Sequence, residues 1–174
     1  MKKLLYIFFA VSIIFSSCKK EEGCTDSLAF NFNIDAEEDD GSCVFGITGG
    51  SWITQSLEAT GTMTVSFGGF PILDSTLNIV ETNPDSLDPY KLTFTDDGLY
   101  TEHDNLDNTV EGGSWSVSGD QLTINTPDTT LLLVIESVDR DNAVLNLHIV
   151  ESSNDNGVTI DIDITQTINS IREW

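Results

Sequence analysis

The chain has 174 residues, with 29 Asp and Glu against 7 Lys and Arg, and carries a formal net charge of −22 at pH 7. This length predicts one domain, at most with a small module attached. From Glu21 onward the basic residues are Lys91, Arg140 and Arg172, and a surface so negative repels phosphate backbones and anionic lipids. We therefore expect no nucleic-acid partner. Cations, basic proteins and small neutral or apolar ligands suit this charge.

Residues 1–17 have the pattern of a signal peptide. Two lysines follow Met1, and residues 4–15 form an apolar run broken by Ser12. The run is too short to span a bilayer core of about 30 Å at about 1.5 Å per residue, but it has the length of the hydrophobic region of a signal peptide.

The signal ends in Phe15-Ser16-Ser17-Cys18, and small residues directly before a cysteine resemble a bacterial lipobox. The resemblance implies that Cys18 begins the mature chain and carries acyl groups, which hold a protein on a membrane at about 0.8 kcal/mol per buried CH2. The next residues, Lys19-Lys20-Glu21-Glu22, resemble the export tag of Bacteroidetes surface lipoproteins. We expect an outer-membrane lipid anchor at the cell surface. The alternatives are residence in the inner leaflet and a secretory signal cleaved elsewhere.

The chain contains three cysteines, Cys18, Cys24 and Cys43. With Cys18 acylated, the other two form an even pair in an exported, oxidising compartment. We therefore predict a Cys24–Cys43 disulfide, which in the loop-entropy model contributes about 3 kcal/mol. It would close a loop within residues 18–45, a segment too short to have a core of its own.

The loop between these cysteines is acidic. Residues 23–45 read GCTDSLAFNFNIDAEEDDGSCVF, which resembles a short cysteine-bounded repeat of exported flavobacterial proteins and implies no particular biochemical role. Candidate calcium ligands, chosen for their alternating side-chain oxygens, are Asn31, Asn33, Asp35, Asp39 and Asp40. An EF-hand is excluded because Ala36 and Ser42 stand where that loop requires Gly and Glu. An irregular calcium site and a solvated acidic spacer are the two interpretations left open.

Residues 46–174 show alternation typical of strands. Val158, Ile160, Ile162 and Ile164 alternate with Thr and Asp, which predicts a strand with one buried and one wet face. Turn residues such as Asp96-Asp97-Gly98 and Ser118-Gly119-Asp120 separate the segments. The predicted strands are roughly 51–58, 61–67, 76–81, 90–95, 99–103, 114–118, 121–125, 130–137, 143–150 and 158–168. We expect an all-β fold, an antiparallel meander that closes into a barrel of about 8–10 strands because closure removes exposed edges.

Two Gly-Ser-Trp motifs mark this domain, Gly50-Ser51-Trp52 and Gly113-Ser114-Trp115. The first resembles the Gly-x-Trp of lipocalins, and the strand and turn order of residues 90–149 resembles the lipocalin-like domains of Bacteroidetes lipoproteins. This resemblance implies a calycin-type barrel in which a Trp plugs one end and an Arg near the last strand stacks on it. The Arg candidates are Arg172 and Arg140. We expect Gly50, Trp52, Gly113 and Trp115 to form a barrel floor, with each Trp opening a strand and largely buried.

Catalytic patterns are scarce in this sequence. His103 and His148 each stand alone in a strand pattern, and no HExxH, CxxC, GxSxG or P-loop occurs. We therefore expect no enzyme and no cofactor, calcium aside, and a monomer.

Two non-enzymatic functions follow from this fold. In the first, the barrel mouth binds a small apolar or amphipathic ligand. In the alternative, a filled barrel serves an accessory or adhesive lipoprotein that contacts macromolecules or polysaccharide through loops 82–89 and 104–113.

Overall fold

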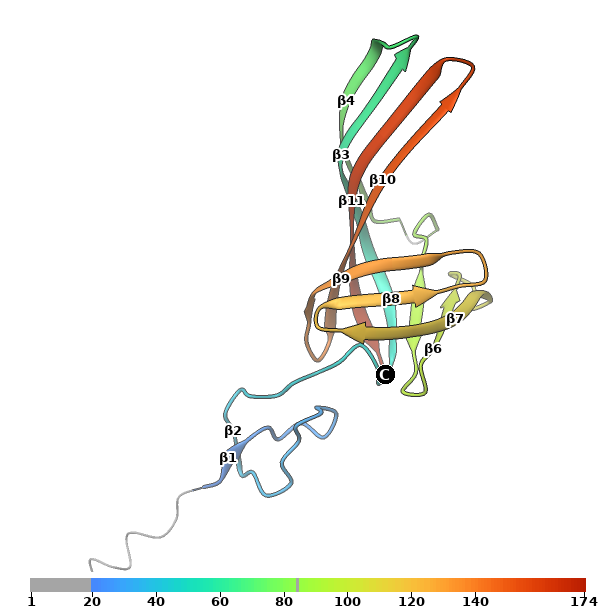
Figure 1. Ribbon diagram of the computed structural model, residues 1–174. Coiled ribbons are helices and arrows are strands. Elements are labelled where there is room, and N and C mark those ends of the chain that lie inside the picture. The colour runs from blue at the N-terminus through green and yellow to red at the C-terminus, as the bar shows by residue number, and fades with distance from the viewer. Residues whose placement is uncertain (1–19, 84) are drawn as a thin grey trace, which may run out of the picture. The chain divides into compact units, whose positions relative to one another are not determined.

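A computed structural model describes residues 20–83 and 85–174 (Figure 1). Cys18 and the predicted signal peptide lie outside these residues. The chain divides into two compact units after Val44. Within the described residues every regular element is a strand, and none is a helix of the length and hydropathy that crossing a membrane requires.

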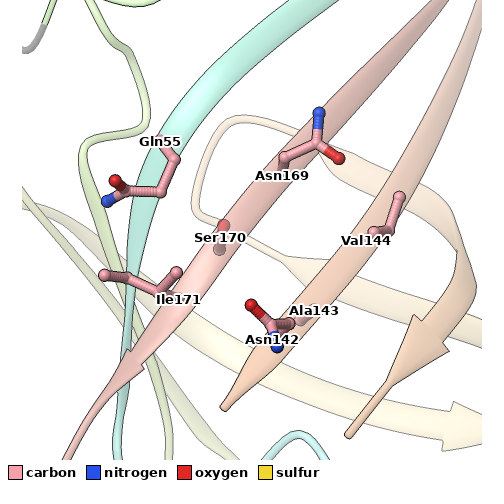
Figure 2. Close-up of a pocket in the computed structure, with 7 residues that line it drawn as sticks. All are labelled: Gln55, Asn142, Ala143, Val144, Asn169, Ser170 and Ile171. Atoms are coloured by element: carbon pink, nitrogen blue, oxygen red, sulfur yellow. The ribbon is translucent and has the colours of Figure 1, made fainter.

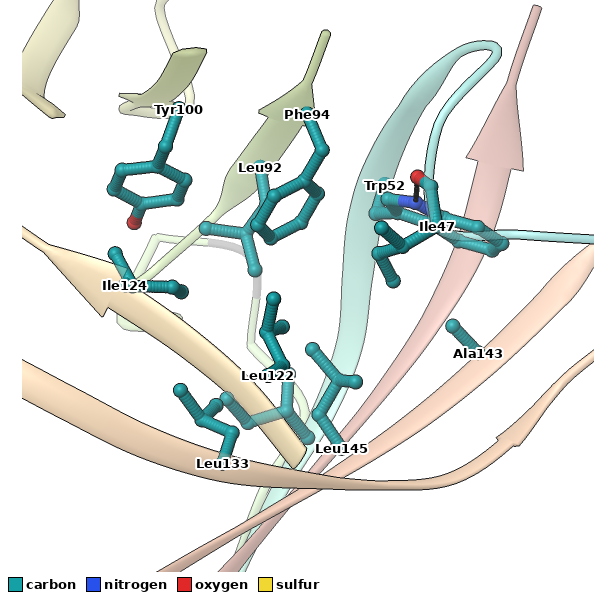
Figure 3. Packing of buried hydrophobic residues seen from close by; sticks show 11 residues of the cluster. Ile47, Trp52, Leu92, Phe94, Tyr100, Leu122, Ile124, Leu133, Ala143 and Leu145 are labelled. Carbon is teal, nitrogen blue, oxygen red and sulfur yellow. Dashed lines mark hydrogen bonds between the residues drawn. The ribbon is translucent and has the colours of Figure 1, made fainter. Parts of the chain in front are cut away.

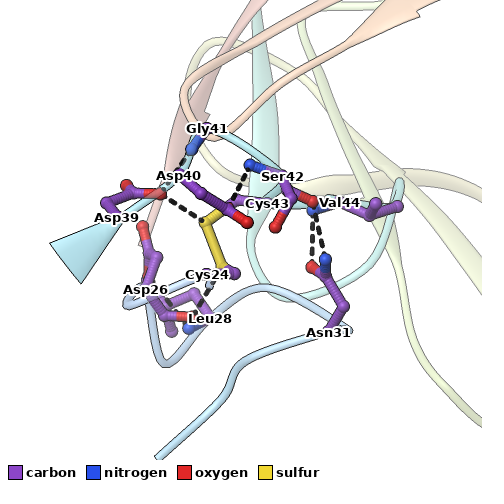
Figure 4. The surroundings of a disulfide bond; sticks show 10 residues. All are labelled: Cys24, Asp26, Leu28, Asn31, Asp39, Asp40, Gly41, Ser42, Cys43 and Val44. Carbon is purple, nitrogen blue, oxygen red and sulfur yellow. Dashed lines mark hydrogen bonds between the residues drawn. A yellow bond between two sulfur atoms is a disulfide. The ribbon is translucent and has the colours of Figure 1, made fainter. Parts of the chain in front are cut away.

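The described part of the N-terminal unit is a loop closed by a disulfide. Two short strands, β1 (Glu22–Gly23) and β2 (Glu38–Asp39), pair in parallel. Cys24 and Cys43 are bonded with their Cα atoms 4.8 Å apart, which confirms the predicted pairing (Figure 4). Phe30 and Ile34 are 71% and 82% exposed, so the disulfide and local turns hold this unit instead of an apolar core.

Replacement of both Cys24 and Cys43 by serine should unfold this loop without weakening the barrel. The disulfide contributes about 3 kcal/mol to the loop by limiting its unfolded chain, whereas the barrel core contains neither cysteine. Hydrogen exchange should show lost protection in residues 20–44 and unchanged protection in the barrel strands. A barrel unfolding midpoint that falls with the disulfide would contradict this division.

The second unit is an antiparallel barrel. Its eight strands are β3 (Ser51–Phe67), β5 (Lys91–Phe94), β6 (Leu99–His103), β7 (Thr109–Ser118), β8 (Gln121–Asn125), β9 (Thr130–Val138), β10 (Asn142–Asp155) and β11 (Val158–Glu173). Each pairs with the next along the chain, and β11 pairs with β3 to close the barrel. A further strand, β4 (Phe70–Glu81), pairs with β3. The predicted all-β meander barrel is confirmed.

Glycines explain two of the places where the predicted strands differ from the structure. Strand β3 runs unbroken where two strands were predicted, because Gly61 is a point of close approach and not a turn: a Cβ there would lie 2.1 Å from the Asp163 carbonyl oxygen. Strand β7 begins at Thr109, so Gly113-Ser114-Trp115 lies within the strand and does not open it. A Cβ on Gly113 would lie 2.0 Å from the Asn125 carbonyl oxygen. The predicted loop 104–113 is therefore shorter than expected.

Four strands continue beyond the barrel. In Figure 1, β3, β4, β10 and β11 extend together past the shorter strands β5–β8. Strand β10 pairs with β11 along its whole length and with β9 only as far as Leu147, so from His148 onward it has left β9. We call this four-stranded extension, residues 57–81 and 148–165, the arm; its strand order is β4–β3–β11–β10.

Side chains converge inside the barrel (Figure 3). Leu122 and Phe94 are 0% and 1% exposed, and Phe94 packs against Tyr100 with ring centroids 5.4 Å apart. The buried cluster comprises Ile47, Trp52, Leu92, Phe94, Tyr100, Leu122, Ile124, Leu133, Ala143, Leu145 and Ile168. Burial of one such large side chain stabilises the fold by about 1.5–3 kcal/mol, so this packed interior is what holds the short strands together.

Candidate functional site

Trp52 lies at the end of the barrel where the chain enters it. The indole is 1% exposed, and its Nε1–H donates a hydrogen bond of 2.6 Å to the carbonyl oxygen of Ile47. The guanidinium carbon of Arg172 lies 4.2 Å from the ring centroid, in cation–π geometry. Of the two Arg candidates, the structure therefore places Arg172 on Trp52, whereas Arg140 lies over the ring of Trp174.

Arg172 joins three segments at this floor. Its guanidinium donates to the carbonyl oxygens of Gly46 at 2.6 Å, Thr48 at 3.2 Å and Asp139 at 3.3 Å. Burial lowers the pKa of Arg172, an effect that the nearby carboxylates of Asp141 and Asp139 oppose. The floor is thus closed by a buried charge whose hydrogen bonds go to backbone carbonyl oxygens.

Gly50 lets the chain pass close to this arginine. Its φ is +149°, and a Cβ would lie 2.7 Å from the carbonyl oxygen of Glu173 and 3.0 Å from Cγ of Arg172. Glycine is the residue that tolerates both the backbone angle and the close approach. The Gly of the first Gly-x-Trp motif therefore seats Arg172 above Trp52.

Trp115 has a different role from Trp52. It is partly buried and packs edge-on against Phe94, with ring centroids 5.7 Å apart. Its indole N–H donates to the carbonyl oxygen of Thr95 at 3.0 Å. Trp52 is therefore buried as predicted, whereas Trp115 is only partly buried. The Trp115 indole contacts the turn between β5 and β6 through Thr95.

Two segments that the sequence singled out as contact loops meet at a pocket. The pocket has a volume of about 300 Å³ and is lined by Asp85, Leu87, Asp88, Tyr90, Asp104, Asn105 and Val110. The side chain of Asn105 donates to Asp85 at 2.8 Å and so joins the two segments. Hydrogen bonds from Asn108 lower the pKa of Asp104, which keeps that carboxylate ionised. We call this the loop pocket.

A group of carboxylates lies next to the loop pocket. The Tyr100 hydroxyl donates to Glu102 at 2.7 Å, and Glu102 lies directly opposite Glu111 on the neighbouring strand. Burial raises the pKa of Glu102, and Asp88 and Glu111 raise it further, while the Tyr100 hydrogen bond opposes them. Burial also raises the pKa of Tyr100. The group is therefore a point of charge repulsion beside the pocket.

Substitution of Glu111 by Gln should stabilise the barrel at neutral pH. The folded pKa of Glu102 lies above its unfolded value, so stability falls as pH rises between the two values. Loss of the opposing charge should add about 0.2–1 kcal/mol near pH 7 and less near pH 4. Urea unfolding at both pH values measures this. Asp74→Asn, on an exposed strand position opposite Thr64, is the control; an equal gain there would contradict the prediction.

The acidic N-terminal loop uses its side-chain oxygens in turns. Asn31 bonds to both Ser42 and Val44, and Asp39 accepts from the backbone N–H of Gly41 (Figure 4). Asn33 and Asp40 likewise accept from backbone N–H groups two residues on. Within residues 20–83 and 85–174 no three His, Cys, Asp or Glu side chains are grouped to hold a metal. Calcium binding stays a prediction, to be tested by calorimetric titration with Ca²⁺.

Two further pockets lie along β10. One of about 200 Å³ lies where β10 pairs with β11 (Figure 2), and its lining from Gln55, Asn142–Val144 and Asn169–Ile171 holds no titratable side chain. The other, of about 360 Å³, lies where β10 separates from β9 and is lined by Thr130–Leu132 and Leu147–Glu151. Leucine and isoleucine side chains share the lining of this second pocket with the polar side chains of Thr130, His148 and Glu151. We call it the fork pocket.

Comparison with protein-family models found no match for this chain, and comparisons with curated proteins and with solved structures likewise found none. Candidate functions are therefore argued from the pockets and surfaces of this chain.

Proposed function

We propose that this chain is a lipoprotein of the outer membrane, exposed at the cell surface, that binds neutral polysaccharide through the loop pocket without catalysis. The observation that carries the proposal is a pocket formed by the two predicted contact loops on a barrel whose interior is packed. The barrel then acts as a rigid support, and recognition belongs to the loops.

The chemistry of the loop pocket suits sugars. Asp85, Asp88 and Asn105 offer oxygen atoms that accept hydrogen bonds from hydroxyl groups, and Leu87 with Tyr90 offers an apolar wall for the C–H face of a sugar ring. A volume of about 300 Å³ is at the lower end for ligand pockets, which favours one sugar unit of a longer chain. The strong negative charge of the protein disfavours anionic polysaccharides.

The binding surface is tested with oligosaccharides of defined composition. The chain should bind one or more members of a panel of neutral gluco-, manno- and xylo-oligosaccharides in calorimetry. Asp85→Ala and Asn105→Ala should each weaken this binding at least tenfold, because both line the pocket and bond to each other. Asp74→Ala, on the arm, should leave it unchanged. Equal affinity of all variants, or no binding to any member, would overturn the proposal.

The lipid anchor is tested by a substitution at Cys18. The small residues before Cys18 support acylation there, and the acyl chains would hold the protein on the membrane. Cys18→Ser should move the protein from the membrane fraction to the soluble fraction. Membrane fractionation that does not change would sink this part of the proposal.

A second candidate function is supported by the fork pocket. Its lining combines Leu131, Leu132, Leu147 and Ile149 with the polar side chains of His148 and Glu151, which suits a small amphipathic ligand at the barrel mouth. Native mass spectrometry of protein purified from its own envelope would show a retained small molecule if this function holds. Leu147→Asp should abolish that retention.

A further inference from the structure

Strand β10 forms one edge of the arm (Figure 1). Of the described strands, β11 alone pairs with residues 148–155, because β9 leaves β10 after Leu147. The backbone N–H and C=O groups of this segment that are directed away from β11 therefore have no strand partner among the described residues. We call residues 148–155 the β10 edge. An unpaired edge of this kind is a template on which another chain can add a strand.

The opposite edge of the arm, formed by β4, is protected against such pairing. Pro71 has no N–H to offer there, and the β3–β4 register shifts between Val65 and Ser66, which marks a bulge. The β10 edge contains no Pro or Lys, and the register of β10 with β11 is continuous from Asn142 to Asp155. Natural sheets use proline, lysine and bulges to prevent edge pairing. The β10 edge is thus the edge of the arm that suits an added strand.

Apolar side chains lie on both sides of the point where β9 and β10 separate. On the interior side, Leu131 and Ile149 line the fork pocket. On the other side Leu132 is 53% exposed and Val150 is 67% exposed. Because successive side chains of a strand point to opposite sides, two adjacent apolar residues of an added strand would cover both groups.

Carboxylates accompany the β10 edge beyond the fork. Glu151 and Asp155 share a side with Ile149, and on the other side Asp161 and Asp163 of β11 lie directly beside β10. The arm contains no Lys or Arg. A strand with cationic side chains would therefore meet a carboxylate on either face, whereas the same acidic edge of a second copy would be repelled.

We propose that an extended basic segment of a partner protein adds to the β10 edge as an antiparallel strand. Two adjacent apolar residues of the segment lie at the fork, one in the fork pocket and one over Leu132 and Val150. Lysine or arginine side chains then lie opposite Glu151 and Asp155. Backbone hydrogen bonds supply affinity in this mode of recognition, and the side chains supply selectivity. At about 3.4 Å per residue, the β10 edge pairs with about 27 Å of extended chain.

The site is distinct from the loop pocket, with which the β10 edge shares no residue. The peptide proposal therefore does not rest on polysaccharide binding. The fork pocket is common to this site and to the second candidate function, so the segment and a small ligand there exclude each other.

The test uses the full mature chain, carrying Cys18→Ser for solubility, and an end-blocked peptide of sequence Lys-Thr-Thr-Thr-Lys-Val-Leu-Thr. Paired antiparallel to the β10 edge, this peptide places its lysines opposite Asp155 and Glu151 and its Val and Leu opposite Val150 and Ile149. Calorimetry should show saturable binding, and hydrogen exchange should show new protection in residues 148–155. Absence of binding, or binding without this protection, would overturn the proposal.

A second peptide separates strand pairing from charge. Its third and fourth residues are proline, so it keeps both lysines and both apolar residues but loses two successive N–H groups. One of the two must face β10, because successive N–H groups of a strand point to opposite sides. This peptide should bind at least tenfold more weakly than the first. Equal affinity of the two peptides would show that no strand is added and would overturn the proposal.

Glu151→Lys tests the position of the site on the arm. It places a cation opposite a lysine of the first peptide and should weaken binding at least tenfold. The matched control is Asp74→Lys, the same charge change at an exposed position of the opposite edge strand, which should weaken binding less than threefold. Equal weakening by both variants would show that net charge alone governs binding and would reject the β10 edge. Oligosaccharide binding by Glu151→Lys is a separate readout, so failure of the peptide site and failure of the sugar site are distinguishable.

Discussion

Truncation of Trp52 to alanine is expected to lower the free energy of unfolding of the barrel by about 3–5 kcal/mol. The indole is 1% exposed, donates to the Ile47 carbonyl and lies under the Arg172 guanidinium. Its removal leaves a cavity and an unsatisfied backbone acceptor together. Urea unfolding followed by circular dichroism measures the loss.

Trp174→Ala is the matched control for this prediction. Trp174 also contacts Arg172, with 4.7 Å between the guanidinium carbon and the ring centroid, but it is 51% exposed. Its truncation should cost clearly less than that of Trp52, because about half of the Trp174 side chain is already in contact with water and contributes no burial. Equal losses for the two tryptophans would show that Trp52 does not close the barrel.

Substitution of Arg172 by Met is expected to cost about 2–4 kcal/mol. Methionine retains an apolar side chain over Trp52 but leaves the carbonyl oxygens of Gly46, Thr48 and Asp139 without this donor. Arg172→Lys should recover part of the loss, since lysine keeps the charge but lacks the planar set of donors.

Arg140→Met controls for the removal of an arginine charge at the same end of the chain. Its side chain is 48% exposed and pairs with Asp141, so a loss within about 1 kcal/mol is expected. Chemical denaturation of all three variants gives the comparison. If Arg172→Met were no more destabilising than Arg140→Met, the stacked arginine would not hold the floor.

Local pattern predicted the strands well because alternation reports a half-buried sheet directly. β6 and β8 have the predicted bounds, and each is flanked by turn residues. The pattern failed at Gly61 and Gly113, because glycine marks both a turn and a close approach of two backbones. What distinguishes a close approach from a turn is a backbone lying against the glycine, which is that of Asp163 at Gly61 and that of Asn125 at Gly113. The local sequence does not specify these partners.

The loop pocket, the arm and the stacking of Arg172 on Trp52 each depend on contacts between segments that are distant in the sequence. The sequence predicts only part of these contacts. The two contact loops were predicted separately, but their meeting depends on the bond between Asn105 and Asp85. The arm was missed because it requires Phe67 to pair with Val158, a register set over ninety intervening residues. Arg172 and Arg140 are both candidates, from the sequence, to stack on the Trp52 ring. The β3–β11 register places Arg172 directly opposite Trp52, which decides between them.

The most direct test of recognition by loops on a packed barrel is a map of chemical-shift changes in the full mature chain. An oligosaccharide that binds would be titrated into isotopically labelled protein, and backbone amide shifts recorded. Shift changes are expected at residues 85–90 and 104–110, with Phe94 and Leu122 of the core unaffected. Changes centred on those core residues, with the loops unaffected, would place the ligand inside the barrel and contradict recognition by the loops.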